Sequence, residues 1–389
     1  MNRFTTSWGA FDLTRFPEDP RDTLRAWDAA DAYLLQHLAE IEAGGEAETG
    51  AGTGPGATVV LGDRWGALAT ALAARRPVQI TDSYLTQRAT VANLRRSGVD
   101  PEAVGLHSVL DAPPERIDLL LVRVPKSLAL LEDQLRRLAP AVHAGTRVVG
   151  AGMVTEIHTS TLKLFEQIIG PTRTSLAVKK ARLIFCTPDP GLPRVPSSWP
   201  RSYPLPADVG IVSGRTVTNH AGIFCADRLD IGTRFLLAHL PAPRGGRVVD
   251  LGCGNGVVGT AMALADPGAE VTFIDESFSA VASARATFAA NAPADAKAEF
   301  VVGDALSQVP AGSVDLVLNN PPFHSHRATS DATARSMFGG ARAALRPGGE
   351  LWVIGNRHLG YHVRLRRLFG NCEVVASDPK FVILRAVRR

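Results

Sequence analysis

Cysteine is scarce in this sequence. Its 389 residues include four cysteines, none of them in a CxxC pair, which argues against a disulfide framework and against a zinc site. They are Cys186, Cys225, Cys253 and Cys372. We therefore expect a protein of a reducing compartment, the cytoplasm, with no bound metal.

Long apolar runs are also missing. No stretch approaches the roughly 20 residues that a membrane-spanning helix needs, and residues 1–5 lack the apolar core of a signal peptide. We expect no membrane partner. The chain has no strong charge of either sign, since its net charge is +4 and its pI is near 9.0. Such a mildly basic protein is compatible with a nucleic-acid partner and does not require one.

Length and proline content indicate two domains. A chain of 389 residues with 45% hydrophobic residues can build two full-sized cores. Residues 187–207 contain seven prolines, which exclude helices and central strands and predict a stiff linker. We expect one domain over residues 1–186 and another over residues 208–389. Residues 44–56, rich in Gly, Ala, Thr and Glu, predict a flexible loop.

The most informative motif is Asn-Pro-Pro-Phe at residues 320–323, directly after an apolar run that predicts a buried strand. The exocyclic amine of a base is a poor nucleophile because its lone pair is delocalised into the ring. A site that methylates it must accept its N–H hydrogens, as the Asn320 side-chain oxygen and the Pro321 carbonyl can. Phe323 offers a ring on which the flat base can stack. The motif therefore predicts methylation of such a nitrogen.

A glycine-rich turn lies upstream of this motif. Gly252, Gly254 and Gly256 follow a predicted strand and precede an Ala-rich helix, so the backbone there can approach a nucleoside cofactor closely. Residues 254–259 also fit the dinucleotide fingerprint, which makes a nicotinamide dehydrogenase an alternative. Asp275 ends the next predicted strand about 20 residues on, where an acid suits ribose hydroxyls in either case.

Later residues separate these two alternatives. Asp304 follows a third predicted strand, where its carboxylate can accept from an adenine amino group, and Asn320 follows the fourth. A dehydrogenase has no use for the Asn-Pro-Pro-Phe motif. The ordered combination resembles the class I S-adenosylmethionine-dependent methyltransferases, an α/β fold with a mostly parallel sheet wrapped by helices.

The first half of the chain repeats this pattern. An offset of 190 residues places residues 58–73 on residues 248–263, so each half contains a strand, a glycine turn and an Ala-rich helix. Asp82 ends the next predicted strand much as Asp275 does. We therefore expect two tandem Rossmann-like domains.

The first copy lacks the residues of the chemistry. Arg64 stands where the second copy has a glycine, Arg123 stands in place of Asn320, and Lys126 in place of Phe323. Arg and Lys carry no acceptor atoms, so this copy cannot activate an amine. It is expected to be a degenerate domain that can contact RNA phosphates.

A degenerate copy followed by an active copy resembles the ribosomal RNA guanine-N2 methyltransferases, and over most of the chain their large-subunit branch. The segments that carry this resemblance are residues 124–132, 156–161, 179–184, 219–224, 229–236 and 355–361. The resemblance implies methylation of one guanine amino group, with S-adenosylmethionine as cofactor. The substrate it implies is 23S ribosomal RNA, and the cost of extruding a base favours protein-free RNA over assembled subunits.

The remaining candidate residues have supporting roles. Phe224 and Thr233 precede the first core strand of the second domain and are candidates to close over the methionine part of the cofactor. The candidate phosphate contacts are Arg123, Lys126, Lys179, Lys180 and Arg182, and His324 is a candidate contact to the base.

Several alternatives stay open at this point. The substrate can be 16S rather than 23S RNA, and enzymes with an Asn-Pro-Pro-aromatic motif also methylate adenine in DNA and glutamine in proteins. A nicotinamide dehydrogenase and a non-catalytic RNA-binding protein are the alternatives from other classes. The sequence leaves the oligomeric state open.

Overall fold

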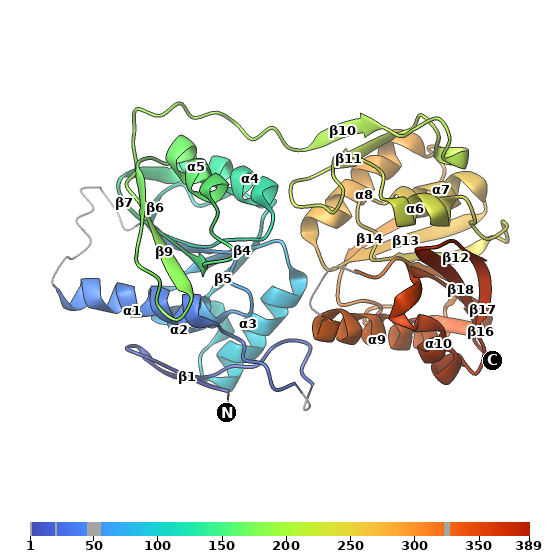
Figure 1. Cartoon of the computed structure of the whole chain (residues 1–389), viewed down its shortest axis with the longest axis horizontal. Helices are drawn as coiled ribbons and strands as arrows, with labels where there is room; N and C mark the ends of the chain where they lie inside the picture. The colour runs from blue at the N-terminus through green and yellow to red at the C-terminus, as the bar shows by residue number, and fades with distance from the viewer. Residues whose placement is uncertain (1, 20–21, 45–55, 323–326) are drawn as a thin grey trace. The chain divides into compact units, whose positions relative to one another are not determined.

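The computed structural model describes residues 2–19, 22–44, 56–322 and 327–389. The chain divides into two compact units, Met1–Ser198 and Trp199–Arg389. Each unit contains its own seven-stranded sheet with helices packed against it (Figure 1). None of the described helices is long and apolar enough to cross a membrane.

The sheet of the second unit has the order β14-β13-β12-β15-β16-β18-β17. Its strands are β12 (Gly246–Leu251), β13 (Ala269–Asp275), β14 (Lys297–Val302), β15 (Val314–Asn319), β16 (Leu345–Asn356), β17 (Glu373–Ser377) and β18 (Phe381–Val387). The five strands from β14 to β16 are parallel, while β18 is antiparallel to both β16 and β17. Because these five strands are parallel, their carboxyl ends meet at one edge, which is where α/β folds bind ligands.

The sheet of the first unit has the same order, β5-β4-β3-β6-β7-β9-β8. Its strands are β3 (Ala57–Leu61), β4 (Val78–Thr81), β5 (Gly105–Ser108), β6 (Ile117–Arg123), β7 (Val142–Met153), β8 (Thr172–Thr174) and β9 (Ala181–Cys186). Strands β5 to β7 are parallel and β9 is antiparallel, as in the second unit. The predicted pair of α/β domains is confirmed.

Helices cover both faces of each sheet. In the first unit α1 (Ala29–Ala43) and α2 (Ala67–Ala71) pack on one face and α4 (Leu128–Leu138) and α5 (Thr159–Ile168) on the other, with α3 (Tyr84–Arg96) beside α2. In the second unit α6 (Ile231–Leu237), α7 (Val257–Ala265) and α8 (Phe278–Asn291) share one face, and α9 (Arg327–Ala344) and α10 (Tyr361–Phe369) share the other.

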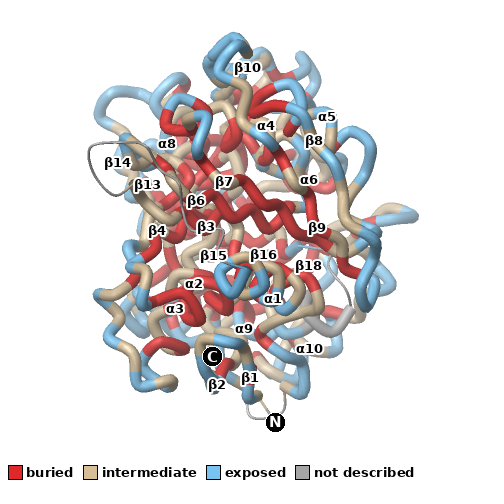
Figure 2. Tube along the Cα trace, turned by 90° about the vertical axis from the view of Figure 1, so that its left-hand side faces the viewer, coloured by how far each residue is buried: buried red, intermediate tan, exposed pale blue. Residues whose placement is uncertain are grey.

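The alternation of side chains along each strand divides the core into two layers. In β12, Val248 joins the cluster under α7 and α8, while Val249 and Leu251 join the cluster over α9 and α10. In the first unit, Figure 2 shows that β3, β6 and β7 are largely buried. Burial of these apolar side chains holds the strand ends, and hence the polar residues that follow them, in fixed places.

The Pro-rich segment differs from the expected linker. Strand β10 (Arg201–Pro204) lies inside residues 187–207 and pairs antiparallel with β11 (Thr216–Asn219) in a separate two-stranded sheet. Proline is tolerated there because a strand with one neighbour needs fewer N–H donors. A second small sheet pairs β1 (Arg3–Thr6) with β2 (Gly9–Asp12). Residues 45–55 of the expected flexible loop lie outside the described residues.

Candidate active site

The glycine turn after β12 adopts the left-handed backbone that its sequence requires. Gly252, Gly254 and Gly256 have φ values of 71°, 53° and 73°. A Cβ on Gly256 would lie 2.7 Å from the Cα of Ala284, whereas a Cβ on Gly254 would meet no described atom within 4 Å. Gly256 thus permits close packing of α8, and Gly254 leaves its side of the loop open to a ligand.

Asp275 secures this loop from the end of β13. Its carboxylate accepts from the N–H of Gly254 and from the N–H of Ser277, both at 3.0 Å. Burial raises the pKa of Asp275, while these backbone N–H donors lower it. Each carboxylate oxygen can accept more than one donor, so Asp275 retains capacity for the hydroxyls of a ribose.

Asp304 follows the neighbouring strand β14. Asp275 pairs with Val302 in the parallel ladder, so the segment that carries Asp304 leaves the same edge of the sheet. The side chain is half-buried, and this burial raises its pKa. Its role toward an adenine stays a prediction.

Asn320 directly follows β15, beside the glycine turn. Its Nδ2 donates to Oγ1 of Thr233 at 3.2 Å, while its Oδ1 is buried and has no hydrogen-bond partner among the described residues. A buried acceptor without a donor costs about 1–3 kcal/mol. An N–H or O–H donor of a bound ligand can satisfy such an acceptor. Pro321 is buried, and Phe323 and His324 lie outside the described residues.

Three supporting residues of this site escaped the sequence analysis. Asp250, inside β12, accepts from the N–H of Gly259 at 2.8 Å and so anchors α7; burial raises the pKa of Asp250 to about 7. The only signal was an acid within an apolar strand. Asn319 is fully buried and donates to the carbonyl of Leu251 at 2.8 Å. This bond joins the strand before Asn320 to the strand before the glycine turn.

The third is Asn219, at the end of β11. It is buried, and its Oδ1 accepts from Nδ2 of Asn255 in the glycine turn at 3.0 Å. The segment that precedes the first core strand is therefore hydrogen-bonded to the glycine turn. Within that segment Phe224 is 58% exposed, whereas Thr233 is buried against Asn320. A cofactor contact of Phe224 stays a prediction.

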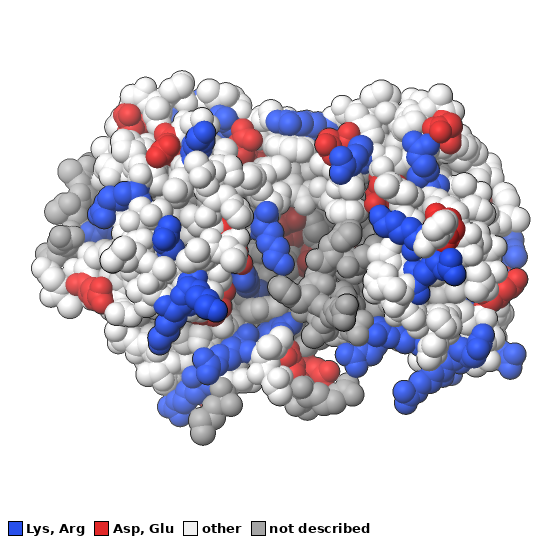
Figure 3. Space-filling view, viewed as in Figure 1, with Lys and Arg blue, Asp and Glu red and all other residues white. Residues whose placement is uncertain are grey.

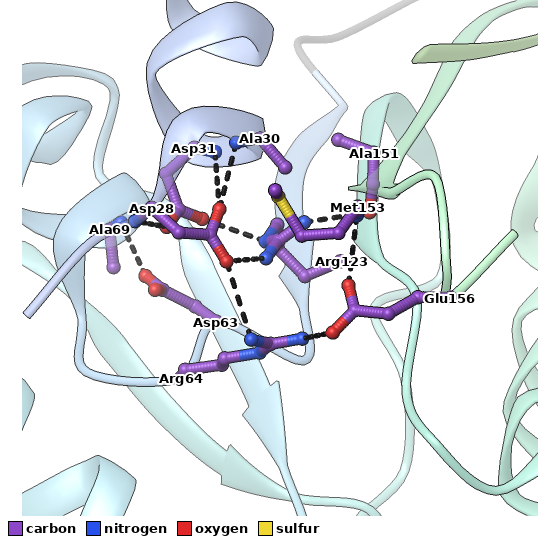
Figure 4. A network of polar contacts seen from close by, with 10 residues as sticks. All are labelled: Asp28, Ala30, Asp31, Asp63, Arg64, Ala69, Arg123, Ala151, Met153 and Glu156. Carbon is purple, nitrogen blue, oxygen red and sulfur yellow. Dashed lines mark hydrogen bonds and ion pairs between the residues drawn. The ribbon is translucent and has the colours of Figure 1, made fainter. Parts of the chain in front are cut away.

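The first unit has ion pairs where the second has this site. Arg123 ends β6 and is only 1% exposed, with Asp31 at 2.7 Å and Asp28 at 2.9 Å (Figure 4). Burial opposes the charge of Arg123, but these carboxylates outweigh it and raise the pKa of the guanidinium. The prediction that Arg123 contacts RNA phosphates is therefore wrong, because its guanidinium is buried against Asp28 and Asp31 inside the unit.

Arg64 completes this network. Its guanidinium contacts Asp28 at 3.3 Å and Glu156 at 2.5 Å (Figure 4). The side chain that replaced a turn glycine thus joins the turn after β3 to α1 and to the segment after β7. In the second unit the corresponding Gly254 leaves open space.

Acids that correspond to Asp275 and Asp304 are also missing from the first unit. Leu61 pairs with Ile80 as Leu251 pairs with Ile274, so the position of Asp275 is taken by Thr81. The expectation that Asp82 occupies it is wrong by one residue.

Strand pairing also identifies the residue of the first unit that corresponds to Asp304. Thr81 pairs with Ser108 as Asp275 pairs with Val302, which puts Leu110 at the position of Asp304. Leu110 packs against the apolar core of the first unit. A leucine cannot accept from an adenine amino group, which agrees with a degenerate copy.

The other predicted phosphate contacts lie at the surface of the first unit. Lys126, Lys179 and Lys180 are exposed, and Arg182 is half-buried on β9. Lys179 and Lys180 form a tight turn, with φ values of 48° and 64°. Their contact with RNA stays a prediction. Among the described residues, no group of three or more His, Cys, Asp or Glu side chains could hold a metal ion.

Comparison with known proteins agrees with both units. Residues 1–190 match the RLMG N-terminal domain, and residues 214–385 match the methyltransferase small domain. The ribosomal RNA large subunit methyltransferase G of Streptomyces griseus is 70% identical over 100% of both chains, and that of Aeromonas salmonicida is 47% identical over 97% of both. The chain belongs to the ribosomal RNA large subunit methyltransferase G family. It is an S-adenosylmethionine-dependent methyltransferase of ribosomal RNA, and the predicted resemblance to the large-subunit branch is confirmed.

A solved structure agrees with the fold of this large subunit methyltransferase G family member. The T. thermophilus 16S rRNA N2 G1207 methyltransferase, solved in complex with AdoMet and guanosine, has a TM-score of 0.74. The alignment covers 100% of this chain and 97% of that one, at 22% identity. Membership of this family excludes two alternatives, the nicotinamide dehydrogenase and the non-catalytic RNA-binding protein.

Proposed function

We propose that this methyltransferase transfers a methyl group to the exocyclic N2 of one guanine in 23S ribosomal RNA. The observation that carries the proposal is the Oδ1 of Asn320, which is buried at the carboxyl edge of the sheet beside the glycine turn and has no hydrogen-bond partner among the described residues. It supports an amine as substrate, because an N–H of the guanine amino group can donate to this acceptor. The relatives' names place their substrate in the large ribosomal subunit.

The proposed reaction needs no strong base. Asn320 Oδ1 and the carbonyl of Pro321 accept the two N–H hydrogens of the guanine and hold the nitrogen lone pair toward the methyl group. Bound S-adenosylmethionine supplies that methyl group on a positive sulfur. The N–C bond forms as the S–C bond breaks, its electrons return to sulfur, and the nitrogen loses one proton to water. In-line positioning contributes at most about 7–11 kcal/mol.

The cofactor is proposed to lie along the carboxyl edge of β12 to β14. Gly252, Gly254 and Gly256 would line its amino-acid end, with Asp275 on the ribose and Asp304 on the adenine amino group. The open side of Gly254 supports this arrangement, since nothing described fills it. Phe323 would stack on the guanine, and His324 would contact the same base.

The first unit is proposed to support RNA recognition. Lys126, Lys179, Lys180 and Arg182 are the proposed phosphate contacts, and the exposure of the three lysines supports them. Figure 3 shows further Lys and Arg side chains over α9 and α10 of the second unit. Among the described arginine side chains of these helices, Arg335, Arg342, Arg366 and Arg367 are exposed.

We also propose protein-free 23S RNA in the cytoplasm as the substrate. The target guanine must leave its stack to reach Asn320, at a cost of a few kcal/mol, and RNA without bound proteins deforms more readily. Intact large subunits that accept methyl faster than free 23S RNA would refute this part.

The deciding experiment is transfer of labelled methyl from S-adenosylmethionine to 16S and 23S RNA transcribed in vitro, followed by nucleoside analysis. We expect label as N2-methylguanosine in 23S RNA alone. Label in 16S RNA would keep the chemistry and overturn the substrate. Label on adenine, or in a DNA or protein fraction instead, would overturn the proposed nucleophile.

A further inference from the structure

We propose that Thr233, held by Asp230, is a positioning residue that fixes which end of the Asn320 side-chain amide faces the substrate. This inference rests on the proposed function, because it assigns Asn320 Oδ1 to the guanine amino group. Its basis is a chain of hydrogen bonds that runs from the start of α6 to the end of β15, between residues 87 positions apart.

The start of α6 places the Thr233 hydroxyl. Asp230 is the N-cap residue of this helix, and its Oδ2 accepts from the N–H of Thr233 at 2.9 Å. Thr233 therefore occupies a fixed position in the first turn, and its side chain is only 8% exposed. Burial leaves such a side chain little room to change its arrangement, which is what a positioning residue requires.

A count of protons then fixes the orientation of the amide. The Thr233 hydroxyl carries one proton, and it lies 3.3 Å from Asp230 Oδ2, an acceptor without a proton of its own when ionised. With that proton directed to Asp230, Thr233 Oγ1 presents only lone pairs to Asn320. The amide atom that faces Thr233 must therefore be the donor Nδ2, which lies at 3.2 Å. Oδ1 is left to point away, buried and without a described partner.

This orientation matters because an Asn amide has two ends of nearly equal size. Rotation by 180° would present an NH2 group to the guanine N2, and two donors facing each other form no bond. The same rotation would bring Oδ1 against the lone pairs of Thr233. Without the hydroxyl, nothing described distinguishes the two orientations, so a fraction of the enzyme would hold the unproductive one.

The first unit has a contact at the position that corresponds to the Thr233–Asn320 contact of the second unit. Asp28 caps α1 as Asp230 caps α6, and Asp31 lies three residues after it, as Thr233 does after Asp230. Asp31 contacts Arg123, the residue at the register position of Asn320. Both units thus bring the third residue of the helix against the residue at the end of the fourth parallel strand. Only the second unit pairs a hydroxyl with an amide.

The test compares Thr233→Val, which keeps the shape and removes the hydroxyl, with Thr233→Ser, which retains it. The measurements are kcat and KM with 23S RNA transcribed in vitro, Kd for S-adenosylmethionine, and the thermal midpoint. We expect Thr233→Val to lower kcat about tenfold or more, the equivalent of one hydrogen bond. Its cofactor Kd should stay within about twofold, and Thr233→Ser should keep kcat within about threefold of the parent.

Thr260→Val is the matched control. Thr260 is buried on α7 in the same unit, and its hydroxyl has no hydrogen-bond partner among the described residues. The same change of atoms should therefore leave kcat unaltered. If Thr233→Val does not fold, Thr233→Ala removes the same hydroxyl without adding a methyl group in its place.

Two outcomes overturn the proposal. An unchanged kcat in Thr233→Val, with Asn320→Ala inactive, would show that the hydroxyl does not orient the amide. A raised cofactor Kd with an unchanged kcat would place Thr233 over the cofactor instead, as its sequence position first suggested. Activity retained by Asn320→Ala is a different failure, since it would overturn the proposed role of Asn320 itself.

Discussion

Arg123 occupies in the first sheet the register position that Asn320 occupies in the second. Val122 pairs with Leu61 on β3, as Asn319 pairs with Leu251 on β12, and the next residue is Arg123 or Asn320. Arg123 is buried against Asp31, while Asn320 Oδ1 has no hydrogen-bond partner in the part of the chain that the structure describes. The same place in the fold therefore holds a closed ion pair in one unit and a candidate substrate site in the other.

Asn320→Ala tests the amine acceptor. Loss of the side-chain oxygen should lower kcat about 100-fold or more, a magnitude known for the loss of a single group that stabilises charge in a transition state. The Kd for S-adenosylmethionine should stay within about threefold, because Asn320 does not belong to the glycine turn. Single-turnover methylation and cofactor titration measure the two effects. A parallel loss of cofactor binding would assign Asn320 to the cofactor instead.

Arg123→Met tests the closed ion pair. The change leaves the buried carboxylate of Asp31 without its cation, so we expect a destabilisation of the first unit by about 3–5 kcal/mol. Urea denaturation measures it. The double variant with Asp31→Leu should recover most of the loss, because it removes both charges together. If RNA affinity fell while stability was unchanged, Arg123 would be an RNA contact after all.

Lys179→Ala and Lys180→Ala test the RNA surface of the first unit. Each lysine that neutralises a phosphate adds about 0.7–0.9 to the slope of log affinity against log salt. Loss of both should reduce the slope by roughly twice that amount. Lys297→Ala is the matched control, since that exposed lysine of the second unit is paired with Glu270 at 2.7 Å. Equal slopes for parent and double variant would exclude the two lysines from the RNA interface.

Gly254→Ala and Gly256→Ala separate ligand access from packing. Both positions have left-handed backbone, which costs a residue with a side chain about 1–2 kcal/mol. At Gly256 the added Cβ would also collide with Ala284 of α8, so this variant should have the lower thermal midpoint. At Gly254 the protein leaves room, and the main loss should be in affinity for S-adenosylmethionine. Differential scanning calorimetry measures the thermal midpoint, and isothermal titration calorimetry measures the affinity for S-adenosylmethionine. Unchanged cofactor affinity in Gly254→Ala would place the cofactor elsewhere.

Asp250→Asn tests a pH dependence of stability. Burial raises the pKa of Asp250 from 3.8 to about 7. Between about pH 4 and 7 the folded carboxyl therefore holds a proton that the unfolded chain has released, so its contribution to stability falls as pH rises through this window. The amide of the variant would keep an acceptor for the N–H of Gly259 and carry no charge.

We expect the stability of the Asp250→Asn variant relative to the parent to increase from pH 4 to 7, by at most about 1.4 kcal/mol per pH unit. Thermal midpoints of the two proteins over this range measure the difference. The comparison is between variant and parent because Asp63 of the first unit, whose pKa burial also raises to about 7, contributes equally to both. Parallel curves would show that Asp250 is ionised in the folded protein.

The sequence by itself determined the features that depend on neighbouring residues. The glycine turn, the acids at two strand ends and the Asn-Pro-Pro motif are short, and their backbone and chemistry follow from residue types at fixed spacing. The repeat of one pattern in both halves was likewise visible along the chain, and the identical strand orders agree with it.

Only the tertiary structure decided which groups meet. The sequence predicts Arg123 as an RNA phosphate contact because it does not show that Asp28 and Asp31 lie against the guanidinium. Thr81 rather than Asp82 takes the position of Asp275, because a one-residue shift in register redirects a side chain. The contact of Thr233 with Asn320 joins residues 87 positions apart. Such contacts depend on how α6 packs against the sheet, and no local spacing encodes that packing.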